Sequence, residues 1–207
     1  MTLNRILKLA GLALTGIAVF ILVQAAYTDI YAGLTQKRLR DDWSKSIAKK
    51  PPPTMTSIQR STTTTLAAIN ERLRSQVVYG KPFARLVIPK INLDAIVLEG
   101  VSADVLAKGP GHMEGTAYPG EIGNVVISGH RVTYSRPFFD LDKLTIGDPI
   151  YIYALTDKFT YRVVEQKVVK PTEISVTDPT PDRTLTLTTC NPRFSAKTRL
   201  IIVAKMQ

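Results

Sequence analysis

Short apolar runs separated by polar turns make up the chain from about residue 82 onward. The runs are rich in Val, Ile, Leu and Thr, and the segments between them contain Gly, Pro, Asn and Asp, a pattern typical of strands joined by turns. Many short strands with few helices predict a mainly β domain over residues 81–207, closed or nearly closed into a barrel. Strands are predicted over residues 85–89, 95–98, 124–130, 149–155, 159–169, 184–190 and 199–205, with one short helix over residues 102–108.

The N-terminal pattern is different, because residues 9–26 contain no charged residue and are mostly Leu, Ala, Ile, Val and Gly. A helix of this length extends about 27 Å, close to the thickness of the hydrocarbon core of a bilayer. We therefore expect a transmembrane helix over residues 9–26. A removed signal peptide is an alternative, since Val23-Gln24-Ala25 resembles a cleavage site. A buried core helix fits less well, because apolar residues cover its whole circumference.

The cations around this span predict its orientation. Arg5 and Lys8 precede the span, whereas the first cation after it is Lys37. Because the cytoplasmic end of a span is enriched in Lys and Arg, residues 1–8 are expected in the cytoplasm. The remainder is then exported, which predicts a single-pass protein of the cell membrane with its β domain outside.

Residues 27–80 are expected to form a basic stalk between the span and the barrel. Residues 1–80 contain 11 Lys/Arg and 4 Asp/Glu, whereas residues 81–207 contain 16 and 13. The excess charge would face anionic lipid or wall polymer, and a stalk that is merely solvated is an equal alternative. No basic and aromatic interleaving indicates nucleic-acid binding, so no nucleic-acid partner is expected. The stalk is predicted to contain an interfacial helix over residues 27–50 with Tyr27, Tyr31 and Trp43 at headgroup level, a spacer at Pro51–Pro53, and a helix over residues 66–77 capped by Thr65.

The chain has one cysteine, Cys190, near its C-terminus. A lone cysteine cannot form an intramolecular disulfide, and one cysteine with two histidines cannot build a cysteine-rich zinc site. Three interpretations remain: a buried inert thiol, a free surface thiol, or a nucleophile. The surrounding residues favour the nucleophile.

Two residues provide that context. Arg199 opens the strand after Cys190, so a hairpin would place the two residues near each other on one face of the sheet. His130 ends an earlier predicted strand and could accept the thiol proton. Taken alone, Arg199 is equally a strand-edge charge and His130 a packed histidine, but the three together are a constellation for thiol acyl transfer.

These residues lie in motifs that resemble those of the sortases, which are membrane-anchored cysteine transpeptidases of mostly Gram-positive bacteria. The resemblance covers about residues 83–205 and is greatest to class E, with classes D and F next. It implies an eight-stranded sortase-type β-barrel with short helices. The matching segments are residues 186–190 (TLTTC) with Arg199, 109–134 (GPGHMEGTAYPGEIGNVVISGHRVTY), 136–142 (RPFFDLD) and 147–149 (GDP).

The resemblance also implies roles. Cys190 would attack the carbonyl of a Thr–Gly bond in an LAxTG- or LPxTG-like sorting signal of a secreted protein, leaving a thioester. His130 would protonate the leaving amine and then deprotonate an incoming peptidoglycan amine. Arg199 would hold the substrate and stabilise the oxyanion. Thr189 and Tyr118 are the expected substrate contacts, each with a structural alternative as a strand residue and a surface aromatic.

The resemblance leaves other features without a role. His112 matches a histidine of the class E pattern, but no chemistry can be assigned to it, and a structural role is favoured. No acidic cluster resembles the calcium site of some class A enzymes, so no metal or other cofactor is expected. Spacing alone does not select a third residue that orients His130.

Two other functions are open at this point. An L,D-transpeptidase is disfavoured, because those enzymes use a His-Gly-Cys context, whereas Thr188 and Thr189 precede Cys190 here. A membrane-tethered peptide-binding or scaffold module with an inactive barrel would give no reason for the three candidate catalytic residues to occur together.

Overall fold

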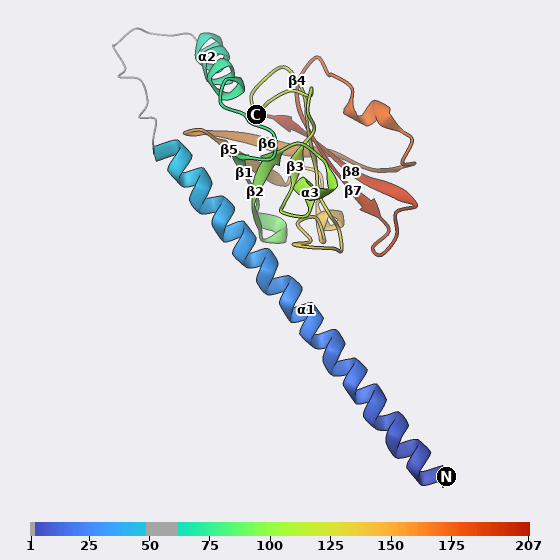
Figure 1. The fold of residues 1–207 in the computed structure, drawn as a ribbon. Coiled ribbons are helices and arrows are strands. Elements are labelled where there is room, and N and C mark those ends of the chain that lie inside the picture. Colours follow the sequence, from blue (N-terminus) through green and yellow to red (C-terminus); the bar gives the residue numbers. More distant parts are fainter. Residues whose placement is uncertain (1–2, 49–61) are drawn as a thin grey trace.

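The computed structural model describes residues 3–48 and 62–207. Eight strands form a closed barrel in the order β1-β2-β3-β4-β7-β8-β6-β5 (Figure 1), which confirms the expected mainly β fold. The strands are β1 (Pro82–Ile88), β2 (Leu93–Glu99), β3 (Gly111–His112), β4 (Gly123–Ser128), β5 (Pro149–Ala154), β6 (Asp157–Val169), β7 (Arg183–Asn191) and β8 (Thr198–Met206). The short helix α3 (Ala103–Leu106) connects β2 to β3.

The strand pairing determines which loops meet at each end of the barrel. β2 pairs with β3 and β4 with β7 in parallel, while β1 pairs with β2 and β3 with β4 in antiparallel fashion. The starts of β1, β4 and β7 therefore lie at one end of the barrel. The end of β4 and the end of β7 lie together at the other.

The sequence pattern missed β3, which contains only two residues. Gly111 lies opposite Leu98 and Ser128, and a side chain there would collide with the backbone, because an added Cβ would lie 2.1 Å from the Gly100 carbonyl oxygen. Two residues, one of them a glycine, give no detectable alternation of apolar and polar positions. β4 also ends at Ser128, so His130 lies in the loop after the strand and not within it.

The barrel interior is apolar and closed. Side chains from every long strand and from the segment around Phe138 form one buried cluster. Large side chains that are almost fully buried include Tyr161, Phe138, Leu86, Ile127 and Ile152. This packed interior holds the strand ends, and hence the residues at them, in fixed relative positions.

The N-terminal segment is one continuous helix, α1 (Leu3–Ala48), in place of a span followed by a separate interfacial helix. Among the described residues it is the one helix long and apolar enough to cross a membrane. Its later turns pack against the barrel: the Gln36 side chain accepts a hydrogen bond from the Ile96 amide at 2.9 Å, and Arg40 pairs with Asp94 at 2.9 Å. Tertiary contacts with β2 thus extend the helix beyond the apolar run.

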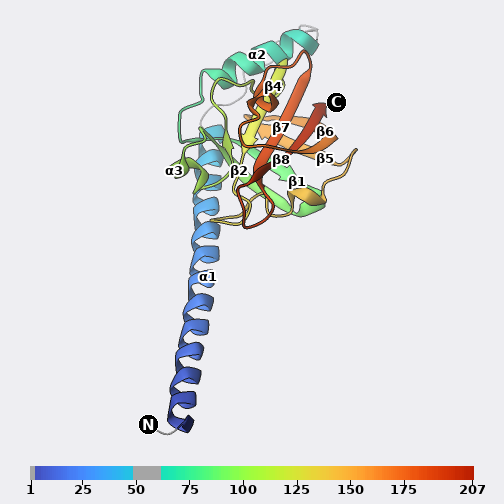
Figure 2. The ribbon, with the colours of Figure 1, turned by 90° about the vertical axis from the view of Figure 1, so that its right-hand side faces the viewer.

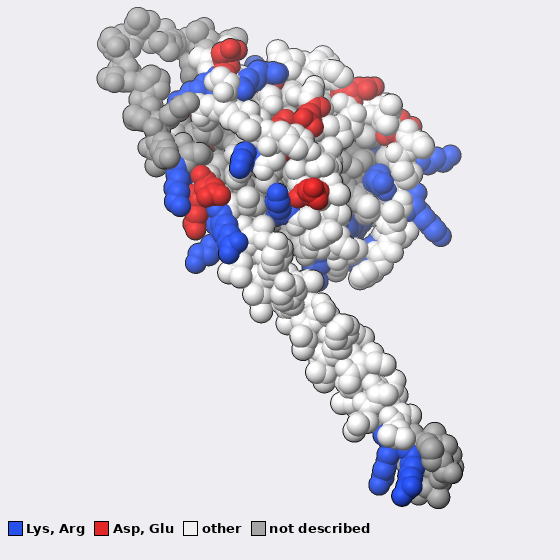
Figure 3. Space-filling view, in the orientation of Figure 1, with Lys and Arg blue, Asp and Glu red and all other residues white. Residues whose placement is uncertain are grey.

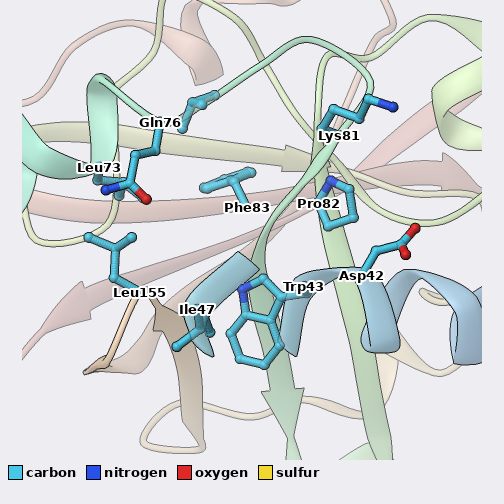
Figure 4. Close-up of a pocket in the computed structure, with 10 residues that line it drawn as sticks. Asp42, Trp43, Ile47, Leu73, Gln76, Lys81, Pro82, Phe83 and Leu155 are labelled. Carbon is cyan, nitrogen blue, oxygen red and sulfur yellow. The ribbon is translucent and has the colours of Figure 1, made fainter. Parts of the chain in front are cut away.

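The predicted headgroup anchor Trp43 lies instead beside the barrel. With Ile47 it lines a cavity of about 340 Å³ between α1, the second helix α2 (Thr62–Arg74) and the start of β1 (Figure 4). Leu73 of α2 and Phe83 of β1 face the same cavity. α2 begins at Thr62, so Thr65 lies inside the helix and is not its cap, and the predicted spacer at residues 51–53 lies outside the described residues.

Candidate active site

Cys190 and Arg199 lie directly opposite each other on β7 and β8. Directly opposed residues of an antiparallel pair point their side chains to the same face, with Cβ atoms about 5 Å apart. The loop between them is closed by Thr198, whose Oγ1 donates to the Asn191 carbonyl at 2.9 Å. The cysteine is a half-buried free thiol, so it is neither inert in the core nor fully exposed. The predicted pairing of thiol and guanidinium is therefore present in the register.

Parallel pairing of β4 with β7 brings His130 to the same end. Ser128 is opposite Thr188, and the Gly129 amide donates to the Thr188 carbonyl at 3.1 Å. Two residues beyond this pair lie His130 on one side and Cys190 on the other. β4 ends at Ser128, so His130 lies in the loop just beyond the paired residues, at the same end of the barrel as Cys190.

Thr189 joins these two strands at the site. Its side chain is 3% exposed, and its Oγ1 donates to the Gly129 carbonyl at 2.7 Å. The hydroxyl therefore holds the backbone next to His130. Its expected contact with substrate stays a prediction, since in this structure the hydroxyl proton is used within the protein.

A buried arginine next to His130 connects the histidine loop to the end of β7. Arg131 is 3% exposed, and its Nη1 donates to Asn191 Oδ1 at 2.8 Å and, over 3.4 Å, to the Cys190 carbonyl. Its Nη2 forms an ion pair with Asp142 at 3.0 Å. Asp142 also accepts a hydrogen bond from Arg193 at 2.8 Å. One side chain thus contacts both segments that carry the candidate nucleophile and base.

Sequence reasoning assigned no role to Arg131 or Asp142. Both fall inside the segments that resemble sortases, but a charged residue after a strand usually lies in solvent. The burial of Arg131 depends on Asp142, eleven residues further along the chain, and on β7, about sixty residues away. A local pattern carries no signal for such partners.

The environment of His130 favours its neutral form. The ring packs against Tyr134, with centroids 4.9 Å apart, and its backbone carbonyl accepts a hydrogen bond from the Phe138 amide at 3.1 Å. Burial lowers the pKa of His130 below its ordinary value of 6.5. A neutral imidazole near pH 7 can accept a proton from a thiol.

The guanidinium of Arg199 lies along the β7–β8 loop. Its Nη1 donates to the carbonyl of Ala196 at 3.0 Å and to that of Thr198 at 3.1 Å. A guanidinium has five N–H donors, so these two bonds fix its plane and leave donors on Nη2 and Nε. Such fixed cationic donors suit an oxygen that becomes negative during acyl transfer.

Tyr118 is not brought together with these residues. It lies shortly before β4, near the end of the barrel opposite Cys190, where its hydroxyl donates to Glu99 at 3.2 Å and its ring lies against His112 and Phe83. Burial and the Glu99 carboxylate raise the pKa of Tyr118 to about 12, so it remains a donor. The contacts of Tyr118 in this structure are structural ones.

His112 belongs to the same buried cluster. It is completely buried, with Nδ1 2.8 Å from Glu99 Oε2 and Nε2 3.0 Å from the Ala117 carbonyl. Glu99 lies beside it on β2 and is 5% exposed. These contacts join β2, β3 and the loop before β4, which supports the structural role expected for this histidine.

Comparison with known proteins identifies the family of the chain. The family profile described as "Sortase domain" matches residues 86–207. The chain belongs to the sortase family. Members of this family are cysteine transpeptidases, and the resemblance drawn from the sequence motifs is confirmed at the level of the family.

Relatives of this sortase include proteins named for classes E and D. It is 38% identical over 143 residues to sortase SrtE1 of Streptomyces coelicolor, an alignment covering 61% of this chain and 41% of that protein. It is 39% identical over 131 residues to sortase D of Bacillus subtilis, covering 61% of this chain and 64% of that protein. The chain thus matches about half the length of these relatives.

Solved sortases share the fold. The structure of sortase E from Streptomyces avermitilis superposes with a TM-score of 0.59 at 40% identity, covering 63% of this chain and 90% of that one. A Clostridium perfringens sortase D5 transpeptidase superposes with a TM-score of 0.67 at 30% identity, covering 84% of this chain and 98% of that one.

Proposed function

We propose that this sortase is a membrane-anchored cysteine transpeptidase of the class E type. It cleaves the Thr–Gly bond of an LAxTG- or LPxTG-like signal in a secreted protein and transfers the protein to a cell-wall peptidoglycan amine. The observation that supports the proposal is the position of Cys190 directly opposite Arg199, with His130 in the loop just after β4 at the same end of the barrel. A solved relative, sortase E1 of Streptomyces coelicolor, holds a tripeptide in its active site.

The first half-reaction forms a thioester. The thiol proton of Cys190 passes to the neutral imidazole of His130, and Sγ attacks the threonine carbonyl carbon. The carbonyl oxygen becomes negative, and the donors on Nη2 and Nε of Arg199 stabilise it. The C–N bond then breaks, and His130 returns the proton to the leaving glycine amine.

The second half-reaction regenerates the thiol. An incoming amine attacks the thioester carbonyl, and His130 accepts the proton that the amine loses. The C–S bond breaks, the thiolate of Cys190 takes up the proton, and a new amide joins the two partners. Water in place of the amine gives slow hydrolysis.

The N-terminal helix supports the cellular location. Sortases act at the cell surface, and the exposed apolar part of α1 has the length and composition of a membrane span. Between the barrel and the cations near the N-terminus the helix surface is free of charge over residues 9–26 (Figure 3). We propose a single pass through the cell membrane, with Arg5 and Lys8 inside and the barrel outside.

The test is turnover by the purified full-length chain in detergent. A quenched LAxTG peptide should be cleaved slowly in water and transferred when an amine is supplied. Mass spectrometry of a trapped reaction should show the acyl group on Cys190. We expect Cys190→Ala to abolish turnover, His130→Ala to lower it by about 10²–10⁴-fold, and Arg199→Ala by about 10²–10³-fold.

Controls separate catalysis from folding. Arg162 is an exposed arginine on β6 that bonds Gln207 and Gly147, so Arg162→Ala should keep full turnover. Undiminished cleavage by Cys190→Ala would remove the nucleophile from the mechanism. Peptide binding without turnover in every variant, including the native chain, would instead indicate a scaffold.

A further inference from the structure

The end of the barrel that carries Cys190 faces the same direction as the apolar part of α1. Pro82, at the start of β1, lies at the end of the barrel where β4 and β7 also start. Cys190, near the end of β7, lies at the opposite end. Two contacts of α1 then define the direction of the helix relative to these two ends.

Ile47 of α1 lines the cavity beside Pro82 and Phe83, whereas Gln36 contacts Ile96, further along the barrel toward the end that carries Cys190. Moving from Ile47 back to Arg40, which pairs with Asp94, and then to Gln36, the helix passes from the Pro82 end to the part of β2 nearer the catalytic end. Its continuation is the apolar segment. Figures 1 and 2 agree from two directions, because both show the loop between β7 and β8 on the side of the barrel turned toward the N-terminal part of α1.

The lengths of the elements bring this end of the barrel close to a bilayer. Gln36 lies ten residues after the end of the apolar segment at residue 26, which corresponds to about 15 Å of helix. β2 extends from Ile96 toward the catalytic end by three residues to Leu93, or about 10 Å along the strand. The headgroup layer on each side of a bilayer is about 5–8 Å thick. With the strand tilt of about 35–45° usual in a barrel, the catalytic end beside Leu93 comes within about 5–8 Å of the hydrocarbon core, which is the thickness of the headgroup layer.

The loop between β7 and β8 has the chemistry of a membrane-contacting segment. Phe194 at its tip is 83% exposed and has a positive φ of 65°. Lys197, three residues further along the loop, is also exposed. Residues 130–146 and 192–199, two of the segments at this end, contain six Lys/Arg and two Asp, and the two Asp pair with Arg131, Lys143 and Arg193. An aromatic side chain flanked by cations is the combination that binds the interface of an anionic bilayer.

We infer that the β7–β8 loop, residues 192–197, docks into the headgroup layer of the same membrane that α1 spans. Phe194 inserts at the acyl boundary, and Lys197 faces anionic headgroups. The inference rests on the proposed anchoring of α1. Its consequence is that Cys190 and Arg199, at the two bases of this loop, work at the membrane surface, on signals presented close to the lipid.

The test uses the full-length chain in nanodiscs of phosphatidylcholine and phosphatidylglycerol, with and without bromine on the upper acyl carbons. Tryptophan is placed on the loop by Phe194→Trp, and at the opposite end by Ile122→Trp, where Ile122 is 65% exposed before β4. Trp43 is common to both variants and to the native chain, whose emission is subtracted. We expect bromolipid to quench the Phe194→Trp emission about twofold or more, and the Ile122→Trp emission little.

A second variant tests the charge. Lys197→Glu in the Phe194→Trp background should reduce the quenching in anionic nanodiscs, since repulsion withdraws the loop. Equal quenching at the two tryptophan positions would overturn the inference. A native chain that does not co-purify with nanodiscs would overturn the anchoring and the docking together. Peptide cleavage measured on the same samples tests the transpeptidase separately, so cleavage without loop quenching defeats only the docking, and loop quenching without cleavage upholds it.

Discussion

Replacing Arg131 with methionine removes the connection between the His130 loop and the end of β7. The charged hydrogen bond to Asn191 Oδ1 at 2.8 Å accounts for about 1.5–3 kcal/mol of stability. Asp142 is 37% exposed and stays paired with Arg193 in the variant, so the ion pair between Arg131 and Asp142 contributes at most about 1 kcal/mol. Methionine preserves the packing of the stem and avoids burying a charge, which offsets part of the loss. We expect a net loss of about 2 kcal/mol.

The assay is urea unfolding of the full-length chain in mild detergent. With a slope of about 2 kcal/mol per molar urea, this loss lowers the midpoint by about 1 M. Arg162→Met is the matched control, because that exposed arginine also donates two hydrogen bonds, and its loss should stay below about 1 kcal/mol. Equal midpoints for the two variants would show that Arg131 does not stabilise the connection between the His130 loop and β7.

Measurements of turnover distinguish an effect of Arg131 on the position of His130 from an effect on overall stability. A displaced His130 lowers kcat by about 10²-fold with little change in KM, at temperatures where the variant remains folded. Arg131→Lys should not restore kcat, since an ammonium cannot contact Asn191 and Asp142 with the geometry of a guanidinium. Recovery of full kcat by lysine would show that charge alone is sufficient.

Three further predictions concern neighbouring groups. Because burial lowers the pKa of His130, an NMR titration of its ring should have its midpoint below 6.5. The free energy of unfolding should decline as pH falls below 6.5, since the unfolded chain binds the proton first. A midpoint above 6.5 would contradict this. Gly129→Ala would bring a Cβ within 2.7 Å of the buried Phe138 ring and should lower the free energy of unfolding by about 1–3 kcal/mol. In the double variant with Phe138→Leu the two losses should sum to less than their separate values, and strict additivity in thermal melts would exclude the clash. The hydrogen bond from Arg85 lowers the pKa of Asp94, so the stability from this ion pair is present above the ordinary carboxyl pKa near 3.8 and is lost as pH falls through the lowered value. Asp94→Asn should therefore lower the free energy of unfolding by about 0.5–1 kcal/mol at pH 7 and by less at pH 3. An equal loss at both pH values would argue against the ion pair.

Local pattern was sufficient where the partners lie close together along the chain. The alternation around Cys190 and the short loop before Arg199 predicted an antiparallel hairpin, and the observed register places the two residues opposite each other. The uncharged run at residues 9–26 likewise predicted a helix by composition alone. In both cases the determining interactions are between near neighbours, so period and composition carry the information.

Long-range pairing decided the rest. The parallel register of β4 with β7 joins segments about sixty residues apart. It places His130 and Cys190 at the same end of the barrel and buries Arg131. β3 exists only because β2 and β4 offer it hydrogen-bonding partners on both sides. The contacts of Tyr118, far from the thiol, depend on the same pairing.

The sequence alone determined which side chains can perform thiol chemistry and which stretch can span a bilayer, because both follow from residue type and spacing. Only the tertiary structure decided how α1 leans on the barrel through Gln36 and Arg40, and hence which end of the barrel faces the apolar segment. The reason is that a helix of uniform apolar surface carries no directional information, whereas a few polar contacts with a closed sheet define one orientation.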